Sequence, residues 1–141
     1  VEAAEGKSVP EIFAADGEDA FRALELHCGR TALQEDHVVM APGGGWAARP
    51  DWAGELPEGT ATVWLAVGPE EAVRRAAADS GTRPLLDVSD PVERSRVLLQ
   101  RRTAAYAAAR WRVDTERSSV EDVTARVLDL LSAHPQENRT E

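Results

Sequence analysis

The sequence predicts an α/β fold in which helices wrap a parallel β-sheet. Three short apolar stretches have the composition of strands: Val38–Ala41, Thr60–Val67 and Trp111–Thr115. The first lacks the polar alternation of a strand with one solvated face, and the second is apolar and β-branched. Helical patterns precede, separate and follow these stretches, and such an alternation is typical of a parallel sheet covered by helices.

A broken helical region is expected before the first strand. Ser8 followed three residues later by Glu11 is a capping box, which predicts a helix over Val9–Ala15. Asp16-Gly17 interrupts that pattern, because both residues favour turns over helix interiors. A second helix is expected over Glu18–His27.

Three further helices are expected in the second half of the chain. Pro69, followed by acidic residues, suits a first helical turn, and this helix should reach about Ala78. Asp90-Pro91 should begin a long, arginine-rich helix that ends near Ala109. Ser118-Ser119 should cap a last amphipathic helix. Its apolar face consists of Val123, Val127, Leu130 and Leu131.

The composition is that of a globular domain and argues against several kinds of partner. Hydrophobic residues make up 43% of the 141 residues, and the formal net charge is -9. A negative charge of this size disfavours nucleic acid and anionic membranes as partners. Cys28 is the single cysteine, which excludes an internal disulfide and favours a reducing, cytoplasmic setting. We expect a cytoplasmic monomer that binds neither nucleic acid nor membrane.

The stretch Pro42-Gly43-Gly44-Gly45 follows the first predicted strand. Three consecutive glycines cost conformational entropy, which is unfavourable unless the backbone turns sharply or lies against another group. Ligands of open α/β sheets bind beyond the carboxyl ends of the strands. The glycines therefore indicate a ligand site, although a loop that is merely rich in glycine fits this observation equally well.

Several familiar site patterns are incomplete in this sequence. Gly6-Lys7-Ser8 has the ending of the phosphate loop G-x-x-x-x-G-K-[ST], but Val1 stands where the first glycine is required. The three histidines are far apart and lack the cysteine or carboxylate neighbours of a metal site. Cys28 is expected to be a small core residue rather than a nucleophile. We assign no residue as a metal ligand.

Arginine is the remaining side chain with suitable chemistry. Arg22, Arg83 and Arg102 fall beside helix starts, breaks and glycine turns in an acidic chain. Guanidinium groups pair with carboxylates and phosphates through two parallel hydrogen bonds. Each arginine alone is compatible with an ordinary surface position. Together with the triple glycine, they indicate a site for an anionic small molecule.

Five motifs follow one another over nearly the whole chain. They are Ser8-Val9-Pro10-Glu11-Ile12-Phe13 with Asp16-Gly17-Glu18 and Phe21-Arg22-Ala23-Leu24-Glu25, then Gly43-Gly44-Gly45, Arg83-Pro84-Leu85-Leu86, Arg101-Arg102-Thr103-Ala104-Ala105-Tyr106, and Val113-Asp114-Thr115 with Arg117-Ser118. Each motif is weak alone, but in this order they resemble the shikimate kinase family: its shikimate-binding segment, second glycine motif, lid, R-x-x-x-Y helix and adenine loop.

The resemblance implies a three-layer α/β/α P-loop kinase fold with a parallel sheet that lacks its first two strands. The kinase domain would span residues 1–133, with shikimate-binding helices over 1–34, a lid over about 76–92, and a disordered tail over 134–141. The family's first strand, which carries the phosphate loop, would lie between the strands at Val38 and Thr62. That loop and the D-x-D segment would precede Val1. We therefore expect the 141-residue polypeptide alone to be inactive and of low stability.

The resemblance also implies a reaction, the ATP-dependent phosphorylation of the 3-hydroxyl of shikimate to shikimate 3-phosphate in chorismate and aromatic amino acid biosynthesis. Arg22 and Arg102 would bind the shikimate carboxylate, and Glu25 would orient Arg22. The glycines Gly43, Gly44 and Gly45 would let the backbone approach the substrate.

The nucleotide side of the implied site is less complete. Arg83 would be catalytic, swinging in with the lid to balance charge on the transferring phosphoryl group and the nucleotide. Arg117 would flank the adenine, although Val120 stands where the family commonly has proline. ATP and Mg²⁺ are the implied cofactors, and their main ligands would lie upstream of Val1.

Two alternatives to a shikimate kinase stay open. One is a non-catalytic, shikimate-kinase-like protein with a binding or regulatory role. The other is a different P-loop small-molecule kinase, such as a gluconate kinase. The F-R-x-x-E segment at Phe21–Glu25 and the triple glycine favour shikimate as the substrate.

Overall fold

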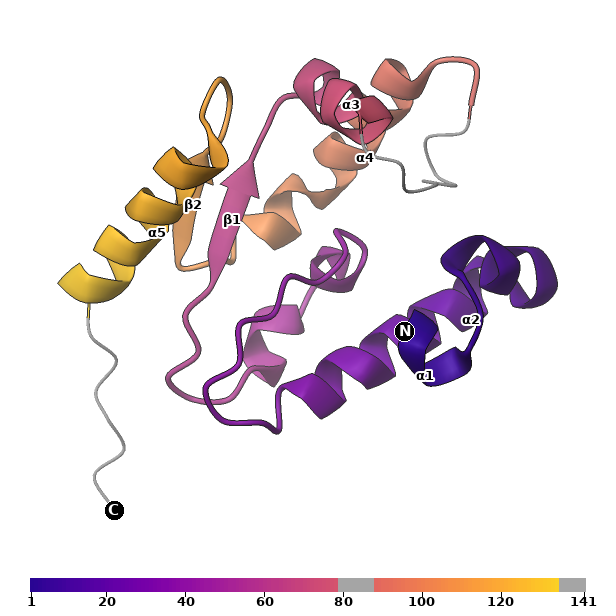
Figure 1. Cartoon of the computed structure of the whole chain (residues 1–141), viewed down its shortest axis with the longest axis horizontal. Coiled ribbons are helices and arrows are strands. Elements are labelled where there is room, and N and C mark those ends of the chain that lie inside the picture. Colours follow the sequence, from indigo (N-terminus) through magenta and orange to yellow (C-terminus); the bar gives the residue numbers. More distant parts are fainter. Residues whose placement is uncertain (79–87, 135–141) are drawn as a thin grey trace.

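The computed structural model describes residues 1–78 and 88–134 as a helical N-terminal half and a C-terminal half built on a small sheet (Figure 1). The N-terminal half contains the α-helices α1 (Glu2–Glu5) and α2 (Val9–Ala32) and two short 3-10 helices, η1 (Trp46–Ala48) and η2 (Trp52–Glu55). The C-terminal half contains β1 (Val63–Ala66), α3 (Pro69–Ala78), α4 (Pro91–Tyr106), β2 (Trp111–Asp114) and α5 (Val120–Ala133).

The predicted start and break of the first long helix are confirmed. The Ser8 side chain accepts from the backbone N–H of Glu11, and the Glu11 carboxylate accepts from the N–H of Ser8, which completes the capping box. Gly17 has φ 82° and ψ 175°, so α2 consists of two helical pieces joined by a kink. The second piece continues through the buried Gly29 to Ala32, beyond the predicted end at His27, and the turn at residues 33–37 follows it.

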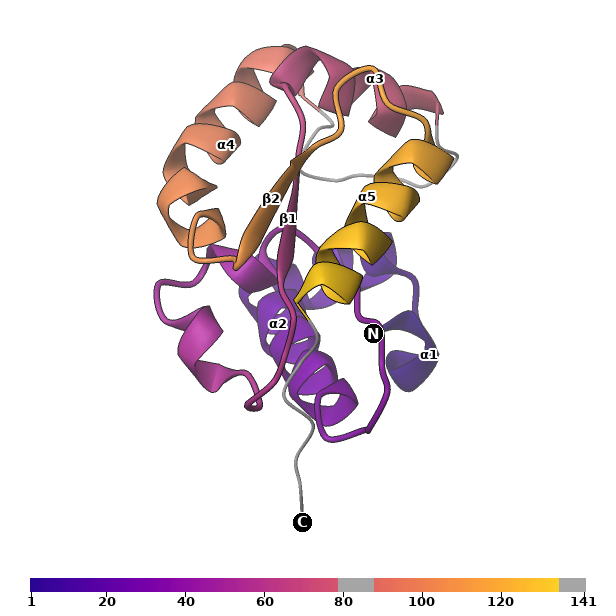
Figure 2. The ribbon, with the colours of Figure 1, turned by 90° about the vertical axis from the view of Figure 1, so that its left-hand side faces the viewer.

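The parallel sheet is confirmed for two of the three predicted strands. β1 pairs with β2 in parallel, with Val63 opposite Trp111 and Ala66 opposite Asp114. Each strand is flanked by helices, with α4 on one side of the sheet and α5 on the other (Figure 2). The described residues therefore form the α/β/α layers that the sequence predicts.

The predicted strand at Val38–Ala41 is wrong for this structure. These residues are irregular, and the described part of the chain provides no strand that pairs with them. Val39 is 97% exposed and Val38 is 44% exposed, although both were expected to be covered. A strand exists only through hydrogen bonds to a neighbour, so apolar, β-branched residues without a partner do not form one.

The three C-terminal helices begin where expected. Asp90 caps α4 by accepting from the N–H of Glu93, and Ser119 forms a capping box with Asp122 at the start of α5. α4 ends at Tyr106, three residues before the predicted end. On α5 the predicted apolar face is half-buried except at Leu131, which is 36% exposed.

Two tryptophans, buried like Ile12 and Phe21 in the N-terminal half, attach that half to α4. Trp46 and Trp52 are 3% and 5% exposed, and their rings meet edge to face with centroids 6.2 Å apart. The indole N–H of Trp52 donates to the carbonyl of Ala105 at 2.8 Å. The tryptophan pair thus places the glycine segment, Gly43–Gly45, beside α4.

No helix in residues 1–78 and 88–134 is both long and apolar enough to span a membrane.

Candidate functional site

Arg22 lies on the second piece of α2, one turn after the kink, between two carboxylates. Its Nη1 bonds Oε2 of Glu25 at 2.6 Å, and its Nη2 bonds Oε1 of Glu18 at 3.1 Å. Partial burial lowers the pKa of Arg22, but the bonds to Glu25 and then to Glu18 outweigh it, so the pKa is raised. Glu25 is only 12% exposed and holds one edge of the guanidinium, whereas Glu18 is 48% exposed. A ligand carboxylate can therefore replace the Glu18 contact without disturbing Glu25.

Each of the three consecutive glycines faces a different side chain, two of them from predicted site residues on α2 and one from Tyr106, which was not predicted as a site residue. A Cβ on Gly43 would collide with the Glu25 carboxylate, and a Cβ on Gly45 would collide with the Arg22 guanidinium. A Cβ on Gly44 would lie 2.7 Å from Oη of Tyr106. Because these glycines have no side chains, Glu25, Tyr106 and Arg22 can lie directly against the backbone of this segment.

Arg102 approaches the same segment from α4. Its Nη1 would lie 3.4 Å from a Cβ on Gly44, and the side chain is half-buried. Within residues 1–78 and 88–134, no carboxylate forms an ion pair with Arg102. The structure therefore brings Arg22 and Arg102 to adjacent glycines, where a small anion could contact both guanidinium groups.

The loops after β1 and β2 meet in a second cluster. Arg75 of α3 donates to the carbonyl of Thr115 at 2.7 Å, and Thr115 is 4% exposed. The N–H of Gly68 donates to Glu116 at 2.8 Å, which ties the two loops together. Arg117 follows in this loop with φ 55°. The predicted adenine loop is therefore rigidly held, but Arg117 is not brought near Arg22 or Arg102 by any described contact.

Glu71 completes this cluster on α3. It accepts hydrogen bonds from Arg74 and Arg75, and these bonds, led by Arg74, lower its pKa to about 2. Glu71 thus holds Arg75 in the orientation that reaches Thr115. Arg75 was not predicted as a functional residue from the sequence. Its spacing of four residues from Glu71 was the available signal.

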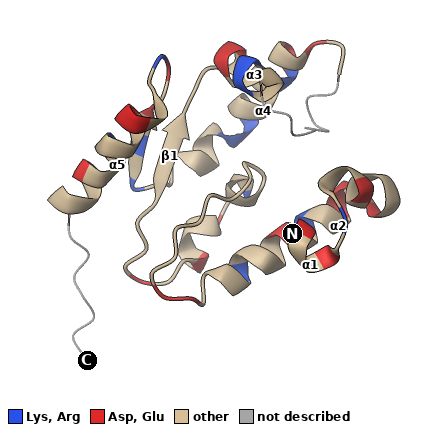
Figure 3. Ribbon diagram, in the orientation of Figure 1, with Lys and Arg blue, Asp and Glu red and all other residues tan. Residues whose placement is uncertain are grey.

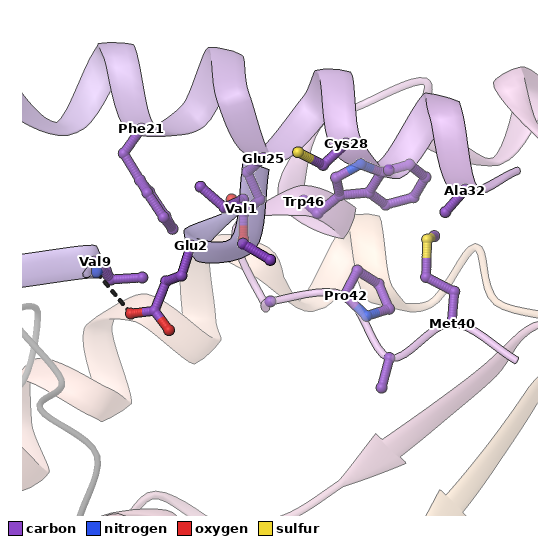
Figure 4. A pocket seen from close by; sticks show the side chains of 14 residues that line it. Val1, Glu2, Val9, Phe21, Glu25, Cys28, Ala32, Met40, Pro42 and Trp46 are labelled. Carbon is purple, nitrogen blue, oxygen red and sulfur yellow. Dashed lines mark hydrogen bonds between the residues drawn. The ribbon is translucent and has the colours of Figure 1, made fainter. Parts of the chain in front are cut away.

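A pocket of about 480 Å³ lies between α1, α2 and residues 40–46 (Figure 4). Its walls are mainly apolar, with Phe21, Met40 and Trp46 among them, and Cys28 lies in the wall as a half-buried thiol. The pocket borders the site through Glu25 and Gly43 but is not lined by either arginine. The pocket therefore lies next to the site of Arg22 and Arg102, and Glu25 and Gly43 border both.

The incomplete phosphate-loop motif has a structural role here. Gly6 ends α1 with φ 65°, and Ser8 caps α2. The Lys7 ammonium pairs with Asp16 at 3.4 Å. Lys7 and Ser8 are thus engaged in contacts that stabilise the start of α2.

No group of three metal-ligating side chains occurs in residues 1–78 and 88–134. Basic and acidic residues are interspersed along α3, α4 and α5 (Figure 3).

Two predicted features fall outside the described residues. Arg83, the predicted catalytic arginine, lies within residues 79–87, as does most of the predicted lid over about 76–92. The predicted tail over 134–141 lies outside as well, apart from His134.

A comparison with protein-family models matches residues 1–132 to the model described as shikimate kinase. The chain belongs to the shikimate kinase family. Members of this family use ATP and Mg²⁺.

Named relatives agree with this membership. A shikimate kinase of Synechococcus sp. (strain RCC307) is 41% identical over 91% of this chain, which spans 65% of that relative's length. A shikimate kinase of Thermus thermophilus is 36% identical over 95% of this chain, which spans 73% of that relative. The chain thus spans 65% to 73% of the length of these two shikimate kinases.

The fold also matches that of a solved shikimate kinase. The enzyme of Acinetobacter baumannii, in complex with shikimate, superposes with a TM-score of 0.87 at 27% identity over 95% of this chain and 75% of that one. The irregular course of residues 38–41 therefore occurs within a shikimate kinase P-loop fold whose sheet is incomplete in this chain.

Proposed function

We propose that this chain forms the shikimate-binding part of a shikimate kinase, the enzyme that transfers the terminal phosphoryl group of ATP to the 3-hydroxyl of shikimate, and that the 141 residues alone do not catalyse the transfer. The observation that carries the proposal is the approach of Arg22 and Arg102 to adjacent residues of the triple glycine. Family membership and the likeness to a kinase bound to shikimate support the choice of substrate. Shikimate has one carboxylate, and two guanidinium groups would bind it with charge-assisted hydrogen bonds.

The described residues would bind shikimate through its carboxylate and its ring. Arg22, held by Glu25, would exchange its contact with Glu18 for the ligand carboxylate, and Arg102 would approach the carboxylate from α4. The exposed backbone of Gly43 and Gly44 would lie under the substrate ring. Binding of this kind positions the 3-hydroxyl for transfer, and positioning supplies much of the catalysis in phosphoryl transfer.

The nucleotide and the metal are only partly accounted for by the described residues. Arg117, in the loop that Arg75 and Glu116 hold in place, would lie beside the adenine. Arg83 would act on the transferring phosphoryl group. Lys7 and Ser8 are engaged in other contacts, so no described residue is assigned to the phosphates or to Mg²⁺. The monomeric state and the cytoplasmic location stay predictions.

Calorimetric titration with shikimate tests the proposal directly. We expect Arg22→Gln and Arg102→Gln each to weaken shikimate binding about 10- to 100-fold, since a hydrogen bond to a charged group contributes about 1.5–3 kcal/mol. Arg112→Gln is the matched control, because Arg112 is an exposed arginine on β2. Gluconate is titrated in parallel. Binding of gluconate in preference to shikimate, or unchanged affinity in both variants, would contradict the proposal.

A further inference from the structure

The only tyrosine of the chain connects α4 with the glycine segment. Tyr106 is the last residue of α4, and its hydroxyl donates a hydrogen bond of 2.7 Å to the carbonyl of Gly44, 62 residues away. Its ring packs against Trp64 of β1, with the centroids 5.8 Å apart. The phenol is thus held at the ring by the sheet and at the hydroxyl by the glycine segment.

Tyr106 and Arg102 act on the same backbone unit. They are four residues apart and therefore share one face of α4. A Cβ on Gly44 would lie 2.7 Å from the Tyr106 hydroxyl and 3.4 Å from Nη1 of Arg102. The neighbouring Gly45 lies against Arg22. Adjacent residues of the glycine segment are therefore in contact with one arginine each, Gly44 with Arg102 and Gly45 with Arg22.

We propose that Tyr106 is a positioning residue that sets the separation of Arg22 and Arg102 by anchoring Gly44 to α4. The inference rests on the proposed function, because it concerns the two arginines that would share the shikimate carboxylate. Two guanidinium groups bind one carboxylate well only when both reach hydrogen-bond distance at once. The hydroxyl acts through Gly44 and has no contact with the substrate.

The first test is a double-mutant cycle on shikimate affinity, measured by calorimetry. Tyr106→Phe removes the hydroxyl and keeps the ring on Trp64. We expect it to weaken shikimate binding about 2- to 10-fold, the effect of one hydrogen bond. In an Arg102→Gln background the same change should have no further effect, because the second guanidinium is already absent. Equal losses in both backgrounds would show a general structural role and overturn the proposal.

A matched control uses another hydroxyl of α4. Thr103 donates to the carbonyl of Leu99 within the helix and does not contact the glycine segment. Thr103→Val should therefore leave shikimate affinity unchanged. A loss as large as that of Tyr106→Phe would also overturn the proposal, because any hydroxyl deletion on α4 would then weaken binding.

The second test needs no ligand, so it separates failure of this inference from failure of the proposed function. Gly44→Ala places a methyl group against the Tyr106 hydroxyl and should lower the free energy of unfolding in urea. In the Tyr106→Phe background this loss should shrink, because the oxygen is gone. Additive effects would show that the contact is absent and would overturn the inference. If the unchanged chain does not bind shikimate, the proposed function fails, and this cycle still decides the contact.

Discussion

Gly45→Ala should separate folding stability from substrate binding. Gly45 has φ -72° and ψ -31°, a conformation that alanine adopts without strain. Alanine restricts the unfolded chain, which stabilises a protein by about 0.4–1 kcal/mol at a compatible site. The new methyl group would occupy the place of the Arg22 guanidinium. The side chain of Arg22 must then move away and give up its bond to Glu25.

The two effects on stability nearly cancel. A partly exposed ion pair contributes about 0.2–1 kcal/mol, comparable to the gain from alanine. We therefore expect the free energy of unfolding to change by less than about 1 kcal/mol. Shikimate affinity should fall about 10- to 100-fold, as for removal of a hydrogen bond to a charged group, because the guanidinium no longer faces the carboxylate.

Urea unfolding and calorimetric titration measure the two quantities on the same preparation. Gly54→Ala is the control, since a Cβ at Gly54 meets nothing within 4 Å. It should leave shikimate binding unchanged. If Gly45→Ala bound shikimate as tightly as the unchanged chain, the placement of Arg22 against Gly45 would not matter for binding, and the site described above would be refuted.

Two further changes test the scaffold. Trp52→Phe removes the 2.8 Å hydrogen bond to the carbonyl of Ala105 and part of the buried ring. The free energy of unfolding in urea should therefore fall by about 1–3 kcal/mol. An unchanged unfolding midpoint would contradict the role of this tryptophan in joining the two halves. Glu71 has its pKa lowered to about 2 by Arg74 and Arg75, so its contribution to stability is present above the ordinary pKa of 4.5 and is lost as the pH falls towards 2. Glu71→Gln should therefore flatten the acid side of the stability profile, and an identical profile would refute this assignment.

Local sequence signals predicted the helix starts well. The capping boxes at Ser8 and Ser119 act over three residues, and both are present in the structure. The kink at Gly17 is equally local, since it depends on the freedom of glycine at positive φ. Such features are readable from the chain because the interacting groups are near neighbours in sequence.

The strand at Val38–Ala41 shows where this approach fails. Its residues have the composition of a buried strand, yet Val39 is 97% exposed because no described strand lies beside it. Strand formation depends on a partner that can come from anywhere in the chain. Within the other two predicted stretches, β1 (Val63–Ala66) and β2 (Trp111–Asp114) form strands because each provides the other with a partner.

The sequence by itself determined the family, the helix boundaries within a few residues, and the residue types of an anionic site. Only the tertiary structure decided how that site is assembled. From the sequence, Gly43, Gly44 and Gly45 were compatible with a plain loop or with a ligand site, and the structure shows that a side chain from α2 or α4 lies against each of them. Those side chains come from residues about 20 to 60 positions away, and such contacts depend on packing of whole elements rather than on local propensity.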